Sequence, residues 1–137
     1  CRKDRKLQVA VENHGAAHNV PSGGVHRHIA VSAWRSSAPS KVWLARLGRT
    51  FRPRADGSKR LASDTTIGPG QRRIFTVDTS TLGSIGGAIN VRFDYIFQAP
   101  DAVDPSTPPE PAISFWERRV RLEDLPKCYM KSTRMIR

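Results

Sequence analysis

The sequence predicts an all-β fold, an immunoglobulin-like antiparallel sandwich of about seven strands. Apolar and polar residues alternate with a period of two in several runs, and turn residues separate those runs. Ten prolines and ten glycines among 137 residues favour many short elements over long helices. A chain of this length forms one domain by the usual size prior and can bury a core without metals or disulfides. We therefore expect one sandwich domain over residues 7–122, with basic segments at 1–6 and 123–137.

The first half of the chain contains three predicted strands. Residues 7–13 (LQVAVEN) place their apolar side chains on one face. Residues 25–34 (VHRHIAVSAW) place Ile29 and Val31 on one face and two histidines on the other. Residues 41–48 (KVWLARLG) form the third alternating run. These runs predict strands that are buried on one side only.

The second half of the chain mixes loops and strands. Residues 49–66 have no sustained period, and their FRPRADGSKR run indicates an exposed basic loop around an Asp-Gly turn. Residues 68–80 supply a turn and a strand, and residues 89–97 (INVRFDYIF) give the strongest strand pattern. The proline-rich residues 99–111 predict a long surface loop, because proline cannot donate to a ladder. Residues 112–122 (AISFWERRVRL) are expected as an edge strand because they carry many charges.

The chain is strongly basic, with a formal charge of +11 and a pI of about 10.8. Such a charge attracts polyanions or an acidic protein partner. The excess lies in the two terminal segments and in one loop, where solvated charge and a dedicated anionic partner are both open readings. The candidate partner-binding residues of the loop region are Arg46, Arg49, Arg52, Arg54, Lys59 and Arg60.

The two cysteines, Cys1 and Cys128, stand at opposite ends of the chain. In an oxidising compartment they could form a disulfide. The sequence begins at Cys1 and not at Met, so lipidation of a processed Cys1, with membrane anchoring, and a fragment boundary are alternatives. Acylation of the Cys1 sulfur and the disulfide exclude each other. No CxxCH motif occurs, which excludes covalent c-type haem attachment to this chain.

All four histidines lie within residues 13–31. The glycines and the proline of this stretch explain a turn without any bound metal. Two roles are then open for His18: a hydrogen bond to its own loop, or service as a ligand. His26 and His28 are two apart on a strand and leave the same face, as a two-histidine metal pair requires. With His18 or His14 they could hold copper or zinc, although a solvated outer face is the favoured reading for His26 and His28.

Arg27 has the strand parity of Ile29 and Val31, which predicts that it points toward the core. A lone buried charge is costly unless it is paired. We therefore expect a structural role for Arg27, with a carboxylate partner chosen from Asp94, Asp64 or Glu12.

Two turns and a strand share an ordered set of short motifs. The first turn contains Asn13, Ala17, His18, Pro21, Ser22 and Gly23 and leads to Arg27; the second contains Asp64, Ile67, Pro69, Gly70 and Arg72 or Arg73; the strand runs from Val91 to Tyr95. Over residues 9–122 this order resembles the β-sandwich domain at the C-terminal end of some bacterial multihaem c-type cytochromes. That family has a GHxxPTG turn, an arginine opening the next strand, an xDxxIxPxExR turn and a vxvxxxYxF strand. Ala17 and Ser22 depart from its glycine and threonine.

The resemblance implies a sandwich without haems that works beside a haem-bearing polypeptide. It implies an exported protein that is periplasmic, outer-membrane-associated or extracellular. His18 is then the first candidate for a ligand donated in trans to a haem iron, while Pro21, Gly23 and Asp64 have structural roles.

Catalysis finds little support, because the sequence has no nucleophile elbow, close carboxylate pair or phosphate loop. We therefore expect a non-enzymatic accessory or structural subunit of a multihaem cytochrome assembly that docks through basic surfaces. A stand-alone copper-binding sandwich and a basic nucleic-acid or capsid-type protein are the alternatives. The aromatic residues alternate as sheet residues and do not interleave with arginines, which argues against nucleic acid as the partner.

Overall fold

The computed structural model describes residues 1–22, 27–83, 86–97 and 112–128. Within these ranges the chain forms eight strands and one short 3-10 helix, η1 (Thr79–Leu82). The strands are β1 (Arg2–Lys3), β2 (Lys6–Glu12), β3 (His28–Arg35), β4 (Ala38–Pro53), β5 (Lys59–Asp64), β6 (Arg72–Asp78), β7 (Ile89–Ile96) and β8 (Ile113–Val120).

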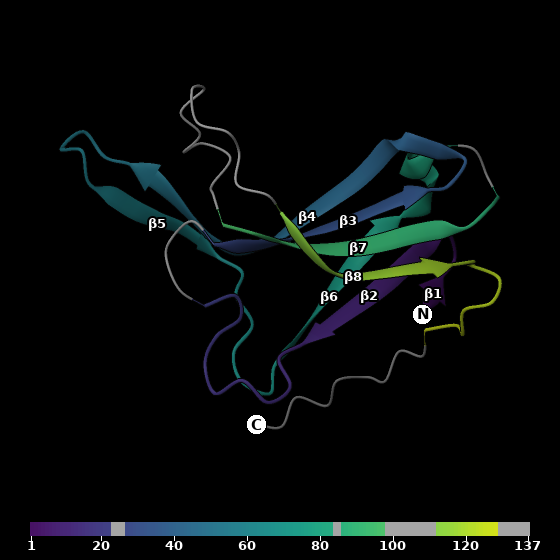
Figure 1. Cartoon of the computed structure of the whole chain (residues 1–137), viewed down its shortest axis with the longest axis horizontal. Coiled ribbons are helices and arrows are strands. Elements are labelled where there is room, and N and C mark those ends of the chain that lie inside the picture. Colours follow the sequence, from purple (N-terminus) through teal and green to yellow (C-terminus); the bar gives the residue numbers. More distant parts are fainter. Residues whose placement is uncertain (23–26, 84–85, 98–111, 129–137) are drawn as a thin grey trace.

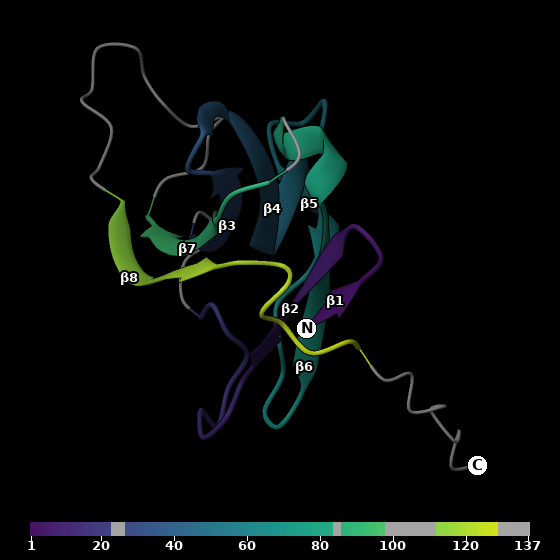
Figure 2. The ribbon, with the colours of Figure 1, turned by 90° about the vertical axis from the view of Figure 1, so that its right-hand side faces the viewer.

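The strands form two antiparallel sheets that face each other (Figure 1). The smaller sheet has the order β1-β2-β6 and the larger one the order β5-β4-β3-β7-β8. Figure 2 shows β8 at the edge of the larger sheet. After β8, the chain crosses toward the N-terminus. The all-β sandwich predicted from the alternation is confirmed. The predicted proline-rich loop at 99–111 lies outside the described residues.

The core fills the space between the two sheets. The smaller sheet contributes Leu7, Phe75 and Val77, and the larger one contributes Ile29, Val31, Ala33, Leu47, Ile89, Val91 and Phe93. On each strand these residues occupy alternate positions, because successive side chains point to opposite faces of a sheet. The apolar alternation therefore identified the inner faces of β2, β3 and β7 correctly, whereas on β4 it did not distinguish the buried Leu47 from the exposed Val42 and Leu44.

The outer face of β3 differs from the expectation. His28 is 4% exposed and Ser32 is buried as well, so this strand is covered on both faces. The expected solvated outer face is wrong at His28. β3 is the central strand of five, and a long side chain from its neighbour β4 lies over it: Arg46 places its Nη2 3.1 Å from His28 Nδ1.

The predicted basic loop at 49–66 is wrong in part, because most of it is a β-hairpin. β4 pairs with β3 as far as Gly48 and then continues to Pro53, pairing with β5. We call residues 49–64 the arm. It projects away from the sandwich (Figure 1), and every residue of β5 is exposed. An exposed hairpin buries neither face, so no apolar period marks its strands.

The end of the arm is the Asp-Gly turn that the sequence predicted. Asp56 Oδ1 accepts hydrogen bonds from the backbone N–H and the hydroxyl of Ser58, at 2.9 and 2.6 Å. Gly57 has a φ of 79°, which favours glycine. These bonds lower the pKa of the Asp56 carboxyl.

Both ends of the described chain meet at β1. Arg2 donates its backbone N–H to Pro126 O at 2.9 Å, and Cys128 donates to Arg2 O at 2.8 Å. Cys1 and Cys128 form a disulfide, with their Cα atoms 5.1 Å apart. The structure therefore has the disulfide alternative, and nothing in it supports a lipidated Cys1. A disulfide of this kind is compatible with an oxidising compartment.

Gly48 marks the point where β4 leaves the sandwich. Its φ is 150°, and a Cβ built there would lie 2.9 Å from His28 Cβ and 3.2 Å from Arg27 O. A side chain at this position would push the outgoing strand away from the start of β3.

We predict that Gly48→Ala lowers the free energy of unfolding by about 1–3 kcal/mol through this strain. Gly57→Ala is the matched control, because it also has positive φ but meets nothing within 4 Å; its expected cost is about 1 kcal/mol. Urea unfolding of both variants measures the difference. Equal losses would show that the close approach at Gly48 does not constrain the junction.

Candidate functional site

The described histidines do not gather into one site. His14 is exposed on its turn, with its Nδ1 4.0 Å from Glu12 Oε1. His18 is exposed and places its Nδ1 3.1 Å from Asn19 O, whereas His28 is buried under Arg46. His26 and Gly23 lie outside the described residues. Within the described ranges, no three His, Cys, Asp or Glu side chains are placed to hold a metal ion.

The two motif turns predicted from the sequence lie against each other. Asn13 is 4% exposed and donates its side-chain amide to His18 O at 2.7 Å and to Ile67 O at 3.0 Å. Val20 and Ile67 exchange backbone hydrogen bonds of 2.9 and 2.8 Å. Pro21 follows and is buried. One buried amide side chain therefore joins residues 13–22, which we call the histidine turn, to the turn at 65–71 that follows the arm.

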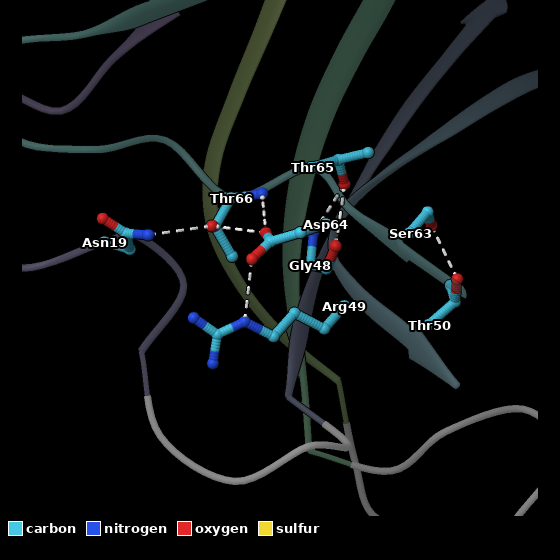
Figure 3. A network of polar contacts seen from close by, with 8 residues as sticks. All are labelled: Asn19, Gly48, Arg49, Thr50, Ser63, Asp64, Thr65 and Thr66. Carbon is cyan, nitrogen blue, oxygen red and sulfur yellow. Dashed lines mark hydrogen bonds and ion pairs between the residues drawn. The ribbon is translucent and has the colours of Figure 1, made fainter. Parts of the chain in front are cut away.

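A second network fixes the base of the arm (Figure 3). The Thr65 hydroxyl lies between both backbone groups of Gly48: it accepts from Gly48 N at 3.0 Å and lies 2.9 Å from Gly48 O. Asp64 accepts from Thr66 N at 2.9 Å, from the Thr66 hydroxyl at 2.6 Å and from Arg49 Nε at 3.0 Å. Asn19 donates to the same Thr66 hydroxyl at 3.2 Å, so the histidine turn takes part in the network.

Arg27 does not enter the core, which corrects the sequence prediction. It is exposed and stacks over the Phe97 ring, with its Cζ 5.8 Å from the ring centroid. β3 begins one residue later, so the parity rule does not extend to Arg27. The three expected carboxylates lie elsewhere: Asp94 pairs with Arg92 and Asp64 with Arg49, while Glu12 Oε1 lies 4.0 Å from His14 Nδ1.

The buried arginine of this strand is Arg35, which the sequence analysis missed. It is 4% exposed and donates to Gly86 O at 2.7 Å and, more weakly, to Gly87 O and Thr79 O. The sequence contained a signal for this burial, because Arg35 lies on the same strand face as Ile29, Val31 and Ala33. Backbone carbonyls accept from its Nη1 and Nη2 at the other end of the strand from Arg27, while its Nε has no partner among the described residues.

The six predicted partner-binding residues separate into two groups. Arg46 lies over His28 and Arg49 pairs with Asp64, so both serve internal contacts. The other four are exposed on the arm: Arg52, Arg54, Lys59 and Arg60. None of these four forms an ion pair with a described residue, and Asp56 is the carboxylate nearest to them in sequence. The arm therefore presents a concentrated positive charge to solvent.

Comparison with known proteins supports the fold and little else. A solved structure, the crystal structure of a penta-heme cytochrome c552 from Thermochromatium tepidum, matches with a TM-score of 0.59 and 14% sequence identity. The match covers 87% of this chain but only 37% of that cytochrome. No protein-family profile matches the chain, and a search of curated proteins gives no match. No helix within the described ranges is long and apolar enough to cross a membrane.

The Asp64 network predicts a dependence of stability on pH. Hydrogen bonds from the Thr66 side chain and backbone, followed by the Arg49 contact, lower the pKa of Asp64 below its ordinary value of 3.8. A lowered pKa in the folded state means that the stabilisation is present above pH 3.8 and is lost as the pH falls through the folded value.

We predict that Asp64→Asn removes this part of the acid dependence. Asparagine can still accept from Thr66, but it carries no charge for Arg49. The free energy of unfolding of the variant should fall less than that of the native chain between about pH 6 and about pH 3. Denaturant titrations across that range measure it. Parallel pH curves for the two proteins would contradict the role given to the Asp64 carboxylate.

Proposed function

We propose that this chain is a non-enzymatic accessory subunit of an exported multihaem electron-transfer assembly. Its fold is like part of a penta-haem cytochrome, and most of that cytochrome has no counterpart in this chain. Both cysteines are joined to each other, so neither thiol is available to attach a haem. The shared fold and the paired cysteines support a sandwich domain that carries no covalent haem and works beside a haem-bearing one.

The observation that carries the proposal is the arm. Four exposed cations, Arg52, Arg54, Lys59 and Arg60, lie on the arm, which projects beyond the sandwich, and none of them forms an ion pair with a described residue. The positive charge of the arm would attract a partner with an acidic face over about a Debye length, and it would orient that partner. Arginine also pairs with carboxylates through two parallel hydrogen bonds, which adds direction to the contact. The proposed docking surface is the arm, and the proposed partner is an acidic multihaem c-type cytochrome.

The histidine turn supplies a second element of the proposal. A carbonyl oxygen can only accept, so the 3.1 Å contact with Asn19 O places a proton on Nδ1 of His18. Nε2 then carries the lone pair on an exposed ring. Ligating histidines commonly hold their second ring nitrogen against a carbonyl in this way. We therefore propose His18 Nε2 as a ligand donated in trans to the iron of a haem in the partner.

Charge reversal on the arm tests docking. The paired change Arg52→Glu and Arg54→Glu should weaken association with a co-purified c-type cytochrome by about tenfold or more, because contacts between opposite charges become repulsive. The tagged chain is purified from its native host, and the haem absorbance per mole of chain is compared at about 0.05 M and about 0.5 M salt.

The matched control is Arg5→Glu with Lys41→Glu, which makes the same charge change at exposed positions outside the arm. An equal loss in both double variants would mean that only the net charge matters. Retention of haem protein by the arm variant, or co-purification of nucleic acid in its place, would refute docking through the arm.

His18→Ala tests the proposed ligand in the same complex. Removal of an axial imidazole should change the visible and electron paramagnetic resonance spectra of one partner haem, while the protein still binds. His14→Ala is the control, because His14 is an exposed histidine of the same turn. Identical spectra for the native chain and both variants would rule out ligation by His18 and leave docking intact.

A further inference from the structure

The sandwich has an open seam between β2 and β8. β1 pairs with β2 at Lys6 and Leu7, and Cys1 O accepts from Gln8 N at 2.8 Å. β1 and the segment joined to it by the disulfide therefore cover only the first half of this edge of β2. Beyond Gln8, no strand in the described part of the chain pairs with β2 on this side. The seam is closed at one end and open at the other.

The open half of β2 has backbone groups that pair with no described residue. Asn13 donates to Gln71 O on the β6 side, and peptide groups of alternate residues point the same way in an antiparallel pair. Ala10 and Glu12 therefore direct their N–H and C=O groups away from β6, toward the open edge. Both residues are exposed. Such an edge can accept another strand.

Apolar side chains line the seam beside this edge. A cavity of about 340 Å³ lies there, lined by Val9, Ala10, Val11, Glu12, Phe93, Phe115 and Trp116. Phe115 and Trp116 are 55% and 41% exposed, although both stack against Phe93 with ring centroids 6.1 and 5.1 Å apart. Two half-exposed aromatic rings beside a free strand edge form a surface that lacks a cover within the described chain.

The charge beside the seam selects its occupant. Phe93 pairs with Trp116 and Val91 with Arg118, so Arg118 and Trp116 leave the same face of β8. Beyond Arg118 a second cavity, of about 510 Å³, is lined by three arginines and one carboxylate: Arg118, Arg119, Arg121 and Asp124, with Ala88, Val120 and Leu125. Apolar surface is therefore followed along β8 by positive charge.

We propose that the seam binds an extended segment of another polypeptide, with alternating apolar and acidic residues, which adds to the open edge of β2. Backbone hydrogen bonds to Ala10 and Glu12 would hold the segment, apolar side chains would pack on Phe115 and Trp116, and an acidic residue would meet Arg118. A second copy of the chain is disfavoured, because each copy brings a charge of +11. This inference does not depend on the arm or on a haem-bearing partner.

The test uses two synthetic peptides of about ten residues, the length of a long strand, in which valine alternates with glutamate or with lysine. The glutamate peptide should bind and slow the hydrogen exchange of the Ala10 and Glu12 amides, which nuclear magnetic resonance measures residue by residue. The lysine peptide should bind at least about tenfold more weakly.

Three variants locate the contact. Trp116→Ala removes the aromatic surface and Arg118→Glu reverses the charge, and each should weaken binding of the glutamate peptide by about tenfold or more. Ala10→Pro removes an edge donor at a position where proline is tolerated, and it should abolish the exchange protection at Glu12. Leu61→Ala, an exposed apolar residue of β5, is the control and should bind normally.

Several results would overturn the proposal. They are equal binding of the two peptides, retention of binding in both Trp116→Ala and Arg118→Glu, and binding without protection at Ala10 and Glu12. Self-association of the free chain that Ala10→Pro abolishes would replace the peptide by a second copy. If Ala10→Pro does not fold, the two exposed side-chain variants still decide. Arm variants leave this seam unchanged, so failure of one proposal does not imply failure of the other.

Discussion

The arm depends on the way in which one strand leaves the sandwich. β4 is 16 residues long and takes part in two different pairings, with β3 up to Gly48 and with β5 from Arg49 onward. Where the pairing partner of β4 changes, the Thr65 hydroxyl contacts the backbone N and O of Gly48. Asp64 pairs with Arg49, the residue that follows Gly48. The arm has no core of its own, so these polar contacts fix its direction relative to the sheet.

The same junction joins the arm to the histidine turn. Thr66 donates to Asp64 and accepts from Asn19 (Figure 3). Asn13 and Val20 form hydrogen bonds with Ile67. The resemblance to the cytochrome sandwich rests in part on these two turns, and the structure gives a physical reason for their paired appearance in the sequence. Each turn supplies the hydrogen-bond partners that the other lacks. An exposed His18 and a cationic arm are thereby connected through a few short polar contacts.

The sequence predicted those parts of the fold that bury one face. β2, β6 and β7 have the expected alternation, because water on one side and the core on the other select opposite residue types at alternate positions. The arm was missed because neither of its faces is buried. The roles of Arg27 and Arg35 depended on where β3 begins, and alternation alone does not fix the end of a strand.

The open seam could not be predicted either, since it depends on which strand edge stays uncovered. The β1 pairing and the disulfide close half of the β2 edge, and both link residues that are far apart in sequence. Strand alternation shows which side chains face inward, but it does not show which sheet edges meet. In the sequence, Phe115 and Trp116 stand in a run that is typical of an ordinary edge strand.

The central claim is that the arm and the histidine turn together face a haem-bearing partner. The most direct measurement is a nuclear magnetic resonance map of the isotope-labelled chain bound to the co-purified cytochrome, because paramagnetic ferric haem broadens the amide signals that lie near it. The account predicts broadening in residues 49–64 and around His18, with sharp signals at β1 and β6. Broadening centred on β1 and β6, with the arm unaffected, would contradict it.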